Sequence, residues 1–280
     1  MASYRGKTAW LSTKHQKLDL IAPAMLEQAG LVVKALEIDT DLLGTFSGEI
    51  PRVDTPLNTA IAKAKMGLTA SNQTLGLASE GSIGPDLQNP FLVSNVETVV
   101  FVDISEDLVI HQSHRSFEIV AGSKDVSKGD DLTQFLAAVD FPNHALIAHI
   151  PSRPKLPIIK GIKTYEHLEQ AITELSRDSN VEKVRLETDQ RAHMSPSRRK
   201  NIQLTATKLA IRLASNCPKC EVPGFGLVRF ETGLSCESCG IRNENAIARE
   251  ILCCVRCDYT QAGAVLAESL PTERCDWCNP

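Results

Sequence analysis

The stretch that decides the fold class is Thr8-Ala9-Trp10-Leu11-Ser12-Thr13-Lys14-His15-Gln16-Lys17. It joins a short apolar run, typical of a buried strand, to a turn rich in hydroxyl and cationic side chains. Lys14–Gln28 then carries apolar residues at helical spacing, and Gly30 is a natural helix stop. Leu31–Ile38 is rich in valine, leucine and isoleucine and predicts a second strand. This alternation of strand and helix predicts an α/β fold.

The alternation continues along the chain. Pro56 after Thr55 predicts the start of a helix that continues through Leu57–Met66. Leu75–Ala78 predicts a short strand that runs into a Gly-rich loop at Ser79–Pro85. Two neighbouring strands are expected at Glu97–Asp103 and Leu108–Val120. We therefore expect a mixed sheet with flanking helices.

A second α/β segment is expected between residues 130 and 190. It contains a strand at Ala145–Ile150, a helix at Tyr165–Ser176 and a strand at Val181–Glu187. Strand, helix and strand in this order predict a right-handed crossover onto a parallel pair. A helix at Ser195–Ala214 follows, begun by the Ser-Pro pair that favours helix starts.

The cysteines mark a separate C-terminal module, because all nine lie within residues 217–280. We expect an α/β domain with a pocket at residues 1–128 and an α/β extension with a connecting helix at 129–214. A double zinc-ribbon module is expected at 215–280. The net charge of −4 argues against a general electrostatic footprint for nucleic acid. No apolar leader or membrane-length run is present, so we expect a cytoplasmic protein.

Four Cys-x-x-Cys pairs lie at residues 217/220, 236/239, 254/257 and 275/278, separated by 15, 14 and 17 residues. Two such knuckles at this spacing can surround one tetrahedral zinc ion, and a reducing cytoplasm disfavours disulfides. The predicted metal ligands of two structural zinc ions are Cys217, Cys220, Cys236, Cys239, Cys254, Cys257, Cys275 and Cys278. No histidine follows His193, which disfavours a catalytic zinc in this module.

The pairing of the knuckles is open. A sequential order joins the first knuckle to the second and the third to the fourth. A cross-braced order joins the first to the third and the second to the fourth. We favour the sequential order, because Gly224–Thr232 has the alternating pattern of a strand that turns at Gly233. Cys253 either replaces Cys254 as a ligand or, as we favour, packs as a small apolar residue.

A ligand pocket is expected where loops follow the strands of the α/β domain. Amides and cationic or hydroxyl side chains there can hold a phosphate, and carboxylates can hold Mg²⁺. The predicted phosphate-binding residues are Thr13, Lys14, Lys17, Ser47, Arg52 and Ser82. The predicted catalytic residues are Lys17, Glu80, Glu49, Asp39 and Asp41. Lys17 would hold phosphates, Glu80 would bind the metal, and one of the other three would add a ligand or act as a base.

Residues 7–120 resemble the inosine/xanthosine triphosphatase family. Ser12–Lys17 is similar to the Thr-x-Asn-x-x-Lys phosphate loop of that family, with Lys14 in place of the asparagine and Lys17 matching the lysine. Ala60–Gly67 resembles its Ala/Lys helix, and Glu80-Gly81 resembles its metal-holding acidic turn, without the paired aspartates. The resemblance implies Mg²⁺-dependent hydrolysis of non-canonical nucleoside triphosphates to monophosphate and pyrophosphate.

The whole chain more closely resembles a bacterial family of uncharacterised proteins, through GTFSGE, ASEGS, RAH and a terminal Cys-x-x-Cys-Asn-Pro. That resemblance implies no function. The segment Asp189–Arg212 has two interpretations. Its cations either form a basic face for phosphate or nucleic acid, or, as we favour, belong to a solvated helix. In the latter case three leucines pack on the core, namely Leu204, Leu209 and Leu213.

Two functions are therefore expected. The first is Mg²⁺-dependent hydrolysis of a nucleoside triphosphate or another phosphate ester by a zinc-binding protein. The alternative is a non-enzymatic protein whose zinc module binds nucleic acid or a protein partner.

Overall fold

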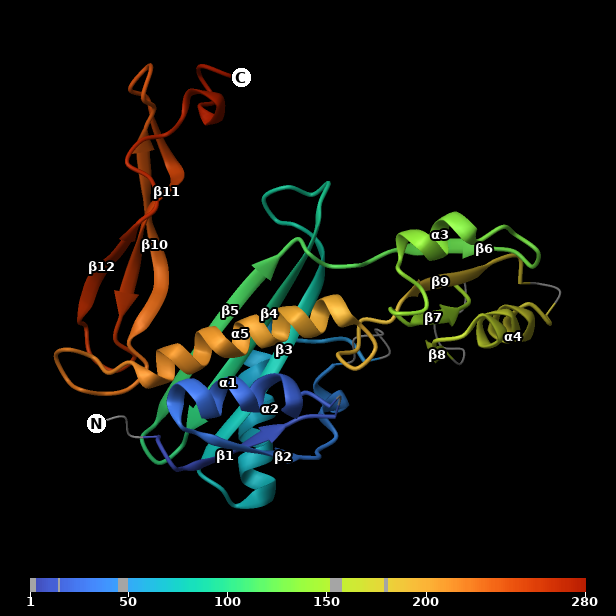
Figure 1. Cartoon of the computed structure of the whole chain (residues 1–280), viewed down its shortest axis with the longest axis horizontal. Coiled ribbons are helices and arrows are strands. Elements are labelled where there is room, and N and C mark those ends of the chain that lie inside the picture. Colours follow the sequence, from blue (N-terminus) through green and yellow to red (C-terminus); the bar gives the residue numbers. More distant parts are fainter. Residues whose placement is uncertain (1–3, 15, 45–49, 152–157, 179–180) are drawn as a thin grey trace. The chain divides into compact units, whose positions relative to one another are not determined.

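The structure is a computed structural model that describes residues 4–14, 16–44, 50–151, 158–178 and 181–280 (Figure 1). The chain divides into two compact units. One unit is Gly6–Leu209, and the other is Ala210–Pro280 together with the residues before Gly6. In the described part of the chain, no helix is both long enough and apolar enough to cross a membrane.

The first unit is built on a five-stranded mixed sheet with the strand order β2-β1-β3-β4-β5. The strands are β1 (Thr8–Ser12), β2 (Val32–Leu36), β3 (Leu75–Pro85), β4 (Val93–Asp103) and β5 (Leu108–Ser116). β1 pairs in parallel with both β2 and β3, whereas β3, β4 and β5 form an antiparallel meander. The expected mixed sheet with flanking helices is confirmed.

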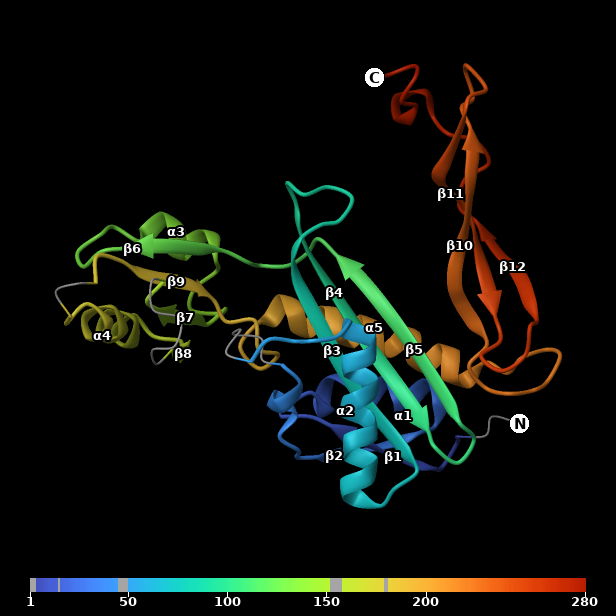
Figure 2. The ribbon, with the colours of Figure 1, turned by 180° about the vertical axis from the view of Figure 1, so that it is seen from behind.

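Helices cover both faces of this sheet. They are α1 (Leu18–Ala29), α2 (Pro56–Ser71) and α5 (Pro196–Ala214), and a short 3₁₀ helix, η1, spans Thr40–Leu43. Figures 1 and 2 show α1 and α5 over one face and α2 over the other. Thr55 caps α2 by accepting a hydrogen bond from the amide of Asn58 at 3.2 Å. The small residues Ala60 and Ala64 of α2 pack against Val100 and Val102 of β4, which closes one side of the core.

The prediction of a Gly-rich loop at Ser79–Pro85 is wrong, because these residues continue the strand β3. They pair with β4 in unbroken register from Ser79 opposite Val99 to Pro85 opposite Val93. β1 ends at Ser12, and its last pairing with β3 joins Leu11 to Leu77. Beyond this point β3 runs on without its neighbour, and side chains from both faces of the sheet can meet at the end of β1.

A second, four-stranded sheet in the same unit has the order β6-β9-β7-β8, and all of its pairings are antiparallel. Its elements are β6 (Ser123–Val126), α3 (Thr133–Ala138), β7 (Leu146–His149), β8 (Ile159–Ile162), α4 (Tyr165–Leu175) and β9 (Val184–Thr188). The expected parallel pair is wrong, because β7 and β9 are antiparallel. The strand β8 at Ile159–Ile162 was not predicted from the sequence. Because β8 lies between β7 and α4, the helix connects β8 to β9 and does not connect β7 to β9.

Helix α5 links the two sheets of the first unit. Near its start, the amide of Ser197 donates to His144 Nε2 at 3.2 Å, which holds the helix to the segment before β7. One turn later Asn201 donates to Asn95 of β4 at 2.8 Å. The expectation that three leucines of α5 are buried is wrong for Leu204, which is 42% exposed. The other two are buried.

The second unit contains a three-stranded antiparallel sheet with the order β10-β11-β12. Its strands are β10 (Gly226–Ser235), β11 (Arg242–Cys253) and β12 (Thr260–Val265), followed by a 3₁₀ helix, η2 (Thr272–Arg274). A small buried cluster near the hairpin turn combines Leu234 and Leu270 with Cys236 and Cys275. Most strand residues of this unit are exposed or half-buried, so apolar packing alone supplies little stability here.

Candidate functional site

The cysteines of the second unit form two sets of four. One set is Cys217, Cys220, Cys254 and Cys257, and the other is Cys236, Cys239, Cys275 and Cys278. Within each set the sulfur atoms all lie within 4.8 Å of one another. The first knuckle therefore joins the third and the second joins the fourth, and the sequential order that we favoured is wrong.

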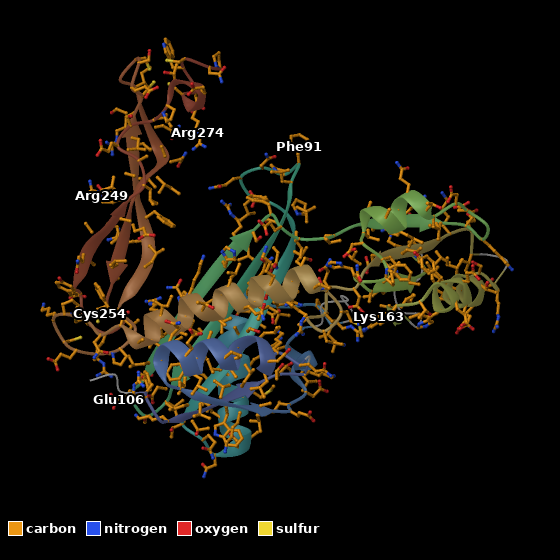
Figure 3. All side chains as sticks on the ribbon, in the orientation of Figure 1. Phe91, Glu106, Lys163, Arg249, Cys254 and Arg274 are labelled. Atoms are coloured by element: carbon orange, nitrogen blue, oxygen red, sulfur yellow. The ribbon has the colours of Figure 1, made fainter. Side chains whose placement is uncertain are left out.

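The hairpin of β10 and β11 explains the crossed pairing. β10 runs for 10 residues, which in an extended strand separates its ends by roughly 30 Å. The first knuckle precedes β10 and the second lies in the hairpin turn, so the two cannot share an ion. The third knuckle follows β11 and returns to the end where the first one lies. Cys254 and Arg274, the latter beside the fourth knuckle, lie at opposite ends of this unit in Figure 3.

The sulfur geometry fits tetrahedral zinc. The sulfur–sulfur distances are 3.7 Å between Cys217 and Cys257 and 3.5 Å between Cys220 and Cys254. In the other set they are 3.9 Å and 3.6 Å. A tetrahedron with zinc–sulfur bonds of about 2.3 Å requires sulfur separations of about 3.8 Å. Disulfide bonds would be far shorter. The two sets could therefore each hold a zinc ion.

Backbone amides favour the thiolate form at these knuckles. The amides of Cys239 and Ser238 donate to Cys236 and lower its pKa to about 7. At Cys254, burial opposes ionisation, but the amides of Cys257 and Arg256 outweigh it and also lower the pKa to about 7. Thiolate is the form that binds zinc, and the amides favour it at Cys236 and Cys254. In the same two sets, burial and neighbouring thiols raise the pKa of Cys220 and of Cys278 to about 12. Cys253 belongs to neither set.

The first unit presents a different site, at the end of β1. Consecutive residues of β3 point to opposite faces of the sheet. Ser79 accepts a hydrogen bond of 2.9 Å from Lys17 Nζ, at the start of α1. Glu80 points to the other face and accepts from Lys63 Nζ of α2 at 2.7 Å. Both lysines are buried, and together they enclose the middle of β3 from its two sides.

Arg52 adds a third cation to this site. Its guanidinium donates to Glu80 Oε1 and to the carbonyl of Gly81, each at 3.1 Å, and to Ser82 Oγ at 2.6 Å. Burial opposes ionisation of Glu80, but the charge and hydrogen bond of Lys63 outweigh it and keep the pKa of Glu80 below its usual value. We call Lys17, Arg52, Lys63 and Glu80 the cationic cluster. It has three positive charges and one negative charge.

A buried ion pair supports the cluster from the α5 side. Arg198 Nε donates to Glu97 Oε1 at 2.6 Å, and the two side chains are 1% and 0% exposed. A Cβ atom at Gly81 would collide with the ends of these two side chains, so any other residue there would force the buried pair to shift. Burial, and next the charge of Arg198, lower the pKa of Lys17 to about 8. The Glu97 carboxylate acts in the opposite direction, but Arg198 is the stronger of the two influences on the pKa of Lys17.

Two cavities adjoin the cluster. The smaller one, of about 30 Å³, is lined by Ser12, Thr13, Lys14, Lys17, Thr40, Gly44, Lys63, Ser79, Glu80 and Arg198. At roughly 10–15 Å³ per water molecule, it has room for two or three water-sized groups. The Ser12 hydroxyl is buried and has no hydrogen-bond partner among the described residues. A polar group that enters this cavity could therefore form a hydrogen bond with the Ser12 hydroxyl.

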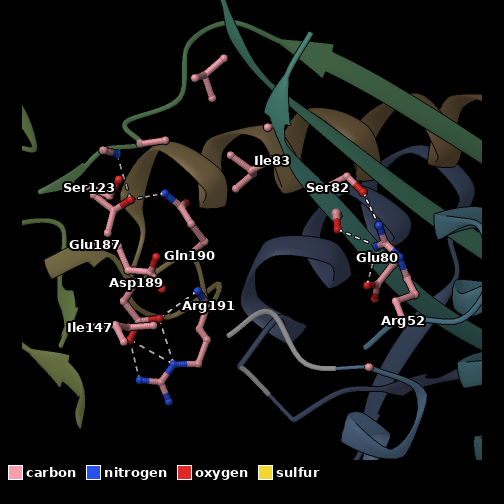
Figure 4. A pocket seen from close by; sticks show the side chains of 17 residues that line it. Arg52, Glu80, Ser82, Ile83, Ser123, Ile147, Glu187, Asp189, Gln190 and Arg191 are labelled. Carbon is pink, nitrogen blue, oxygen red and sulfur yellow. Dashed lines mark hydrogen bonds and ion pairs between the residues drawn. The ribbon is translucent and has the colours of Figure 1, made fainter. Parts of the chain in front are cut away.

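The larger cavity has a volume of about 500 Å³ and shares Glu80 and Gly44 with the smaller one. Figure 4 shows Arg52, Glu80 and Ser82 on one wall. The opposite wall carries residues of β9 and of the segment that follows it, namely Glu187, Asp189, Gln190 and Arg191. Asp189 is fully buried and binds Arg191 at 2.6 Å, which orders this wall. The size is typical of small-ligand pockets.

The structure brings some of the predicted pocket residues together. The smaller cavity is lined by Thr13, Lys14, Lys17 and Glu80, and the larger one by Arg52, Glu80 and Ser82. Asp39 instead forms an exposed ion pair with Lys14 at 3.1 Å. Ser47 and Glu49 lie outside the described residues, as does the side chain of Asp41. The roles assigned to these residues stay predictions.

No carboxylate site for Mg²⁺ is found among the described residues, where only the two cysteine sets form groups able to hold a metal. Reasoning from the sequence also missed three residues of the site, namely Lys63, Glu97 and Arg198. Lys63 carried a usable signal, because it is a lysine on the apolar face of α2, beside Ala60 and Ala64. Glu97 and Arg198 meet only through the tertiary fold.

Comparison with known proteins places the chain in a family. A family model described as a domain of unknown function, DUF6671, matches residues 63–280, which include Lys63, Glu80 and all eight ligand cysteines. None of the curated proteins compared with the chain matches it. The resemblance to the inosine/xanthosine triphosphatases finds no support in these comparisons. Since the model covers well over half of the sequence, the chain belongs to the DUF6671 family, a domain of unknown function.

Proposed function

We propose that the Gly6–Leu209 unit binds a small molecule through a phosphate group at the cationic cluster. We also propose that two zinc ions hold the C-terminal unit together without taking part in chemistry. The observation that carries the first proposal is that Lys17 donates its hydrogen bonds to neutral acceptors. Its ammonium is buried, and the acceptors described for it are the hydroxyl and the carbonyl of Ser79, both neutral.

A buried cation without an anionic partner is costly, because its charge has lost hydration. Adding Lys63 and Arg52, which share the single carboxylate of Glu80, leaves two positive charges uncompensated among the described residues of the cluster. A ligand with two negative charges would neutralise them. Phosphate groups fit this description, and lysine and arginine are their usual ligands in proteins.

The two cavities suggest how such a ligand would be divided. Two or three terminal oxygens of the phosphate group would occupy the smaller cavity beside Lys17 and Lys63, which has room for that many water-sized groups. The rest of the molecule would extend past Glu80 into the larger cavity of about 500 Å³. That volume accommodates a nucleoside or a molecule of similar size.

Two further roles receive less support. Hydrolysis with Mg²⁺ needs a carboxylate that can face the metal, and Glu80 already binds two cations. Nucleic-acid binding by the zinc unit is disfavoured by charge, since residues 210–280 contain seven Arg or Lys against nine Asp or Glu. Each zinc with four thiolates would add two more negative charges. Exposed apolar side chains such as Trp277, 73% exposed, favour a protein partner instead.

Thermal unfolding with increasing phosphate, pyrophosphate, AMP and ATP tests the first proposal. We expect at least one of these anions to raise Tm of the zinc-loaded chain, compared with chloride at equal ionic strength. Lys17→Met should abolish the rise. Lys65→Met is the matched control, because Lys65 lies exposed on the same helix as Lys63. No stabilisation by any of the four anions, or an equal loss in both variants, would contradict the proposal.

A further inference from the structure

We infer that the cationic cluster takes its phosphate as a metal-free dianion, with Lys63 and Arg52 in the place that Mg²⁺ occupies in many phosphate sites. This inference rests on the proposed function and names its ligand class. The ligand is free phosphate or a phosphate monoester, and neither a phosphodiester nor a magnesium–nucleotide complex.

The engagement of Glu80 argues for a metal-free site. Each of its two oxygens already binds a cation, Oε2 with Lys63 at 2.7 Å and Oε1 with Arg52 at 3.1 Å. Mg²⁺ demands close octahedral coordination by oxygen ligands. To coordinate it, Glu80 would have to release a cation and leave that cation buried without a partner. Mg²⁺ would also bring two positive charges into a cluster that already has an excess.

The cations retain donors for an anion. An ammonium has three N–H donors and a guanidinium has five. Lys17 uses two of them on Ser79, and Lys63 uses one on Glu80. Arg52 uses three, which orients its guanidinium without exhausting it. Among the described residues, each of the three side chains therefore keeps at least one N–H donor without an acceptor. The terminal oxygens of a phosphate group can accept these hydrogen bonds.

The charge balance selects the class of phosphate. The uncompensated charge of the cluster is two, as counted over Lys17, Arg52, Lys63 and Glu80. A monoester or free phosphate reaches two negative charges near neutral pH, whereas a diester carries one.

Glu80→Gln distinguishes this arrangement from a magnesium site by the sign of its effect. Calorimetric titration with inorganic phosphate would use zinc-loaded protein in buffer freed of other divalent ions beforehand, because a chelator would remove the zinc. If Glu80 is a counter-ion, losing its charge should tighten phosphate binding by about tenfold. If Glu80 is a metal ligand, binding should need added Mg²⁺ and weaken in the variant. Glu118→Gln is the control, because Glu118 forms an exposed ion pair with Lys200.

If the Glu80→Gln variant does not fold, titrations of the wild-type protein with different phosphates test the inference. Phosphate and a phosphomonoester should bind at least tenfold more tightly than dimethyl phosphate, with or without Mg²⁺. Dependence on Mg²⁺, or equal affinity for the diester, would overturn the inference and leave the proposed function standing. Absence of binding of every phosphate in every buffer would instead overturn the proposed function.

Discussion

The C-terminal unit and the α/β unit both gather side chains of like charge, but with very different amounts of apolar core around them. In the C-terminal unit, eight thiols gather in two sets of four, and one of these sets lies at a small cluster containing Leu234 and Leu270. In the α/β unit, three cations converge at the edge of a sheet whose residues, such as Leu11, Leu77 and Phe101, are fully buried. We therefore expect the C-terminal unit to need metal in order to fold, whereas the α/β unit already has the side chains and cavities of its site in place.

This difference has a physical origin. A domain with a large core has stability to spare and can keep a costly buried charge such as Lys17 for function. A unit of about seventy residues has little to spare, so we expect its stability to depend on metal held by the cysteine sets. Four predictions test this comparison, from the largest expected effect to the smallest.

Removal of zinc should unfold the C-terminal unit and leave the α/β unit folded. Structural zinc sites contribute on the order of 10 kcal/mol to the fold that they hold. Hydrogen exchange of the zinc-loaded and the chelator-treated chain is the measurement. We expect protection of β10 and β11 to be lost and protection of β3 and β4 to persist. Retained protection in β10 would show that metal is not what holds this unit together.

Paired cysteine substitutions should distinguish the crossed sets by zinc content. Cys236→Ala with Cys275→Ala removes two ligands of one set and should leave one zinc ion per chain. Cys217→Ala with Cys239→Ala removes one ligand from each set and should weaken both sites. A sequential pairing predicts the reverse result for the two double variants. Cys253→Ala is the control and should keep both ions.

Stability of the α/β unit should rise with pH through the titration of Lys17. Burial, and next the charge of Arg198, lower its pKa from 10.5 to about 8. The charges of Glu97 and Glu80 act to raise this pKa, and the charge of Lys63 lowers it further. The unfolded chain therefore binds more protons between these pH values, and the free energy of unfolding increases across that window. The difference between the two pKa values of Lys17 corresponds to a change of roughly 3 kcal/mol in the free energy of unfolding.

Denaturant unfolding at several pH values, with Lys17→Met beside the unchanged chain, measures this effect. Below pH 8 the variant should be the more stable of the two, and the gap should close as the pH approaches 10.5. Stabilisation by phosphate should fall over the same range, because the neutral amine binds anions weakly. A gap that does not change with pH would contradict the assignment to Lys17.

Gly81→Ala should destabilise the α/β unit by about 1–3 kcal/mol through overpacking. A methyl group there would meet the Glu97 carboxylate and the Arg198 guanidinium, both buried. Gly84→Ala is the matched control, because it lies on the same strand and nothing lies within 4 Å of its added Cβ. Equal stability of the two variants, measured by thermal unfolding, would show that the Glu97–Arg198 pair can move aside.

Local patterns predicted much of the fold. The strand at Thr8–Ser12 has the expected bounds, and α2 begins at Pro56 after the Thr55 cap. These elements could be predicted because helix caps and apolar runs act over a few residues. The full length of β3 could not be predicted, because Ser79–Pro85 has the composition of a loop. It is a strand because β4 pairs with it and because Gly81 leaves space for Glu97 and Arg198.

The candidate site shows the same division. Lys17 and Arg52 were found because they lie in segments expected to follow strands, where ligand sites gather. Glu80 was found because Ser79–Pro85 was expected to be such a segment, although it lies within β3. Lys63 lies within a helix, and Arg198 lies more than one hundred residues from its partner Glu97. Sequence patterns report neighbours along the chain, and ion pairs between distant segments leave no local signal.

By itself, the sequence determined which atoms can bind metal, because a Cys-x-x-Cys turn places two thiolates on one ion whatever surrounds it. It also determined the α/β class through its alternation of strands and helices. Only the tertiary structure decided which knuckles share an ion, because the length of the β10–β11 hairpin separates neighbouring knuckles and returns the third to the first. Only the tertiary structure, too, decided that Glu80 faces two cations, because α2 and the segment before it both approach the middle of β3.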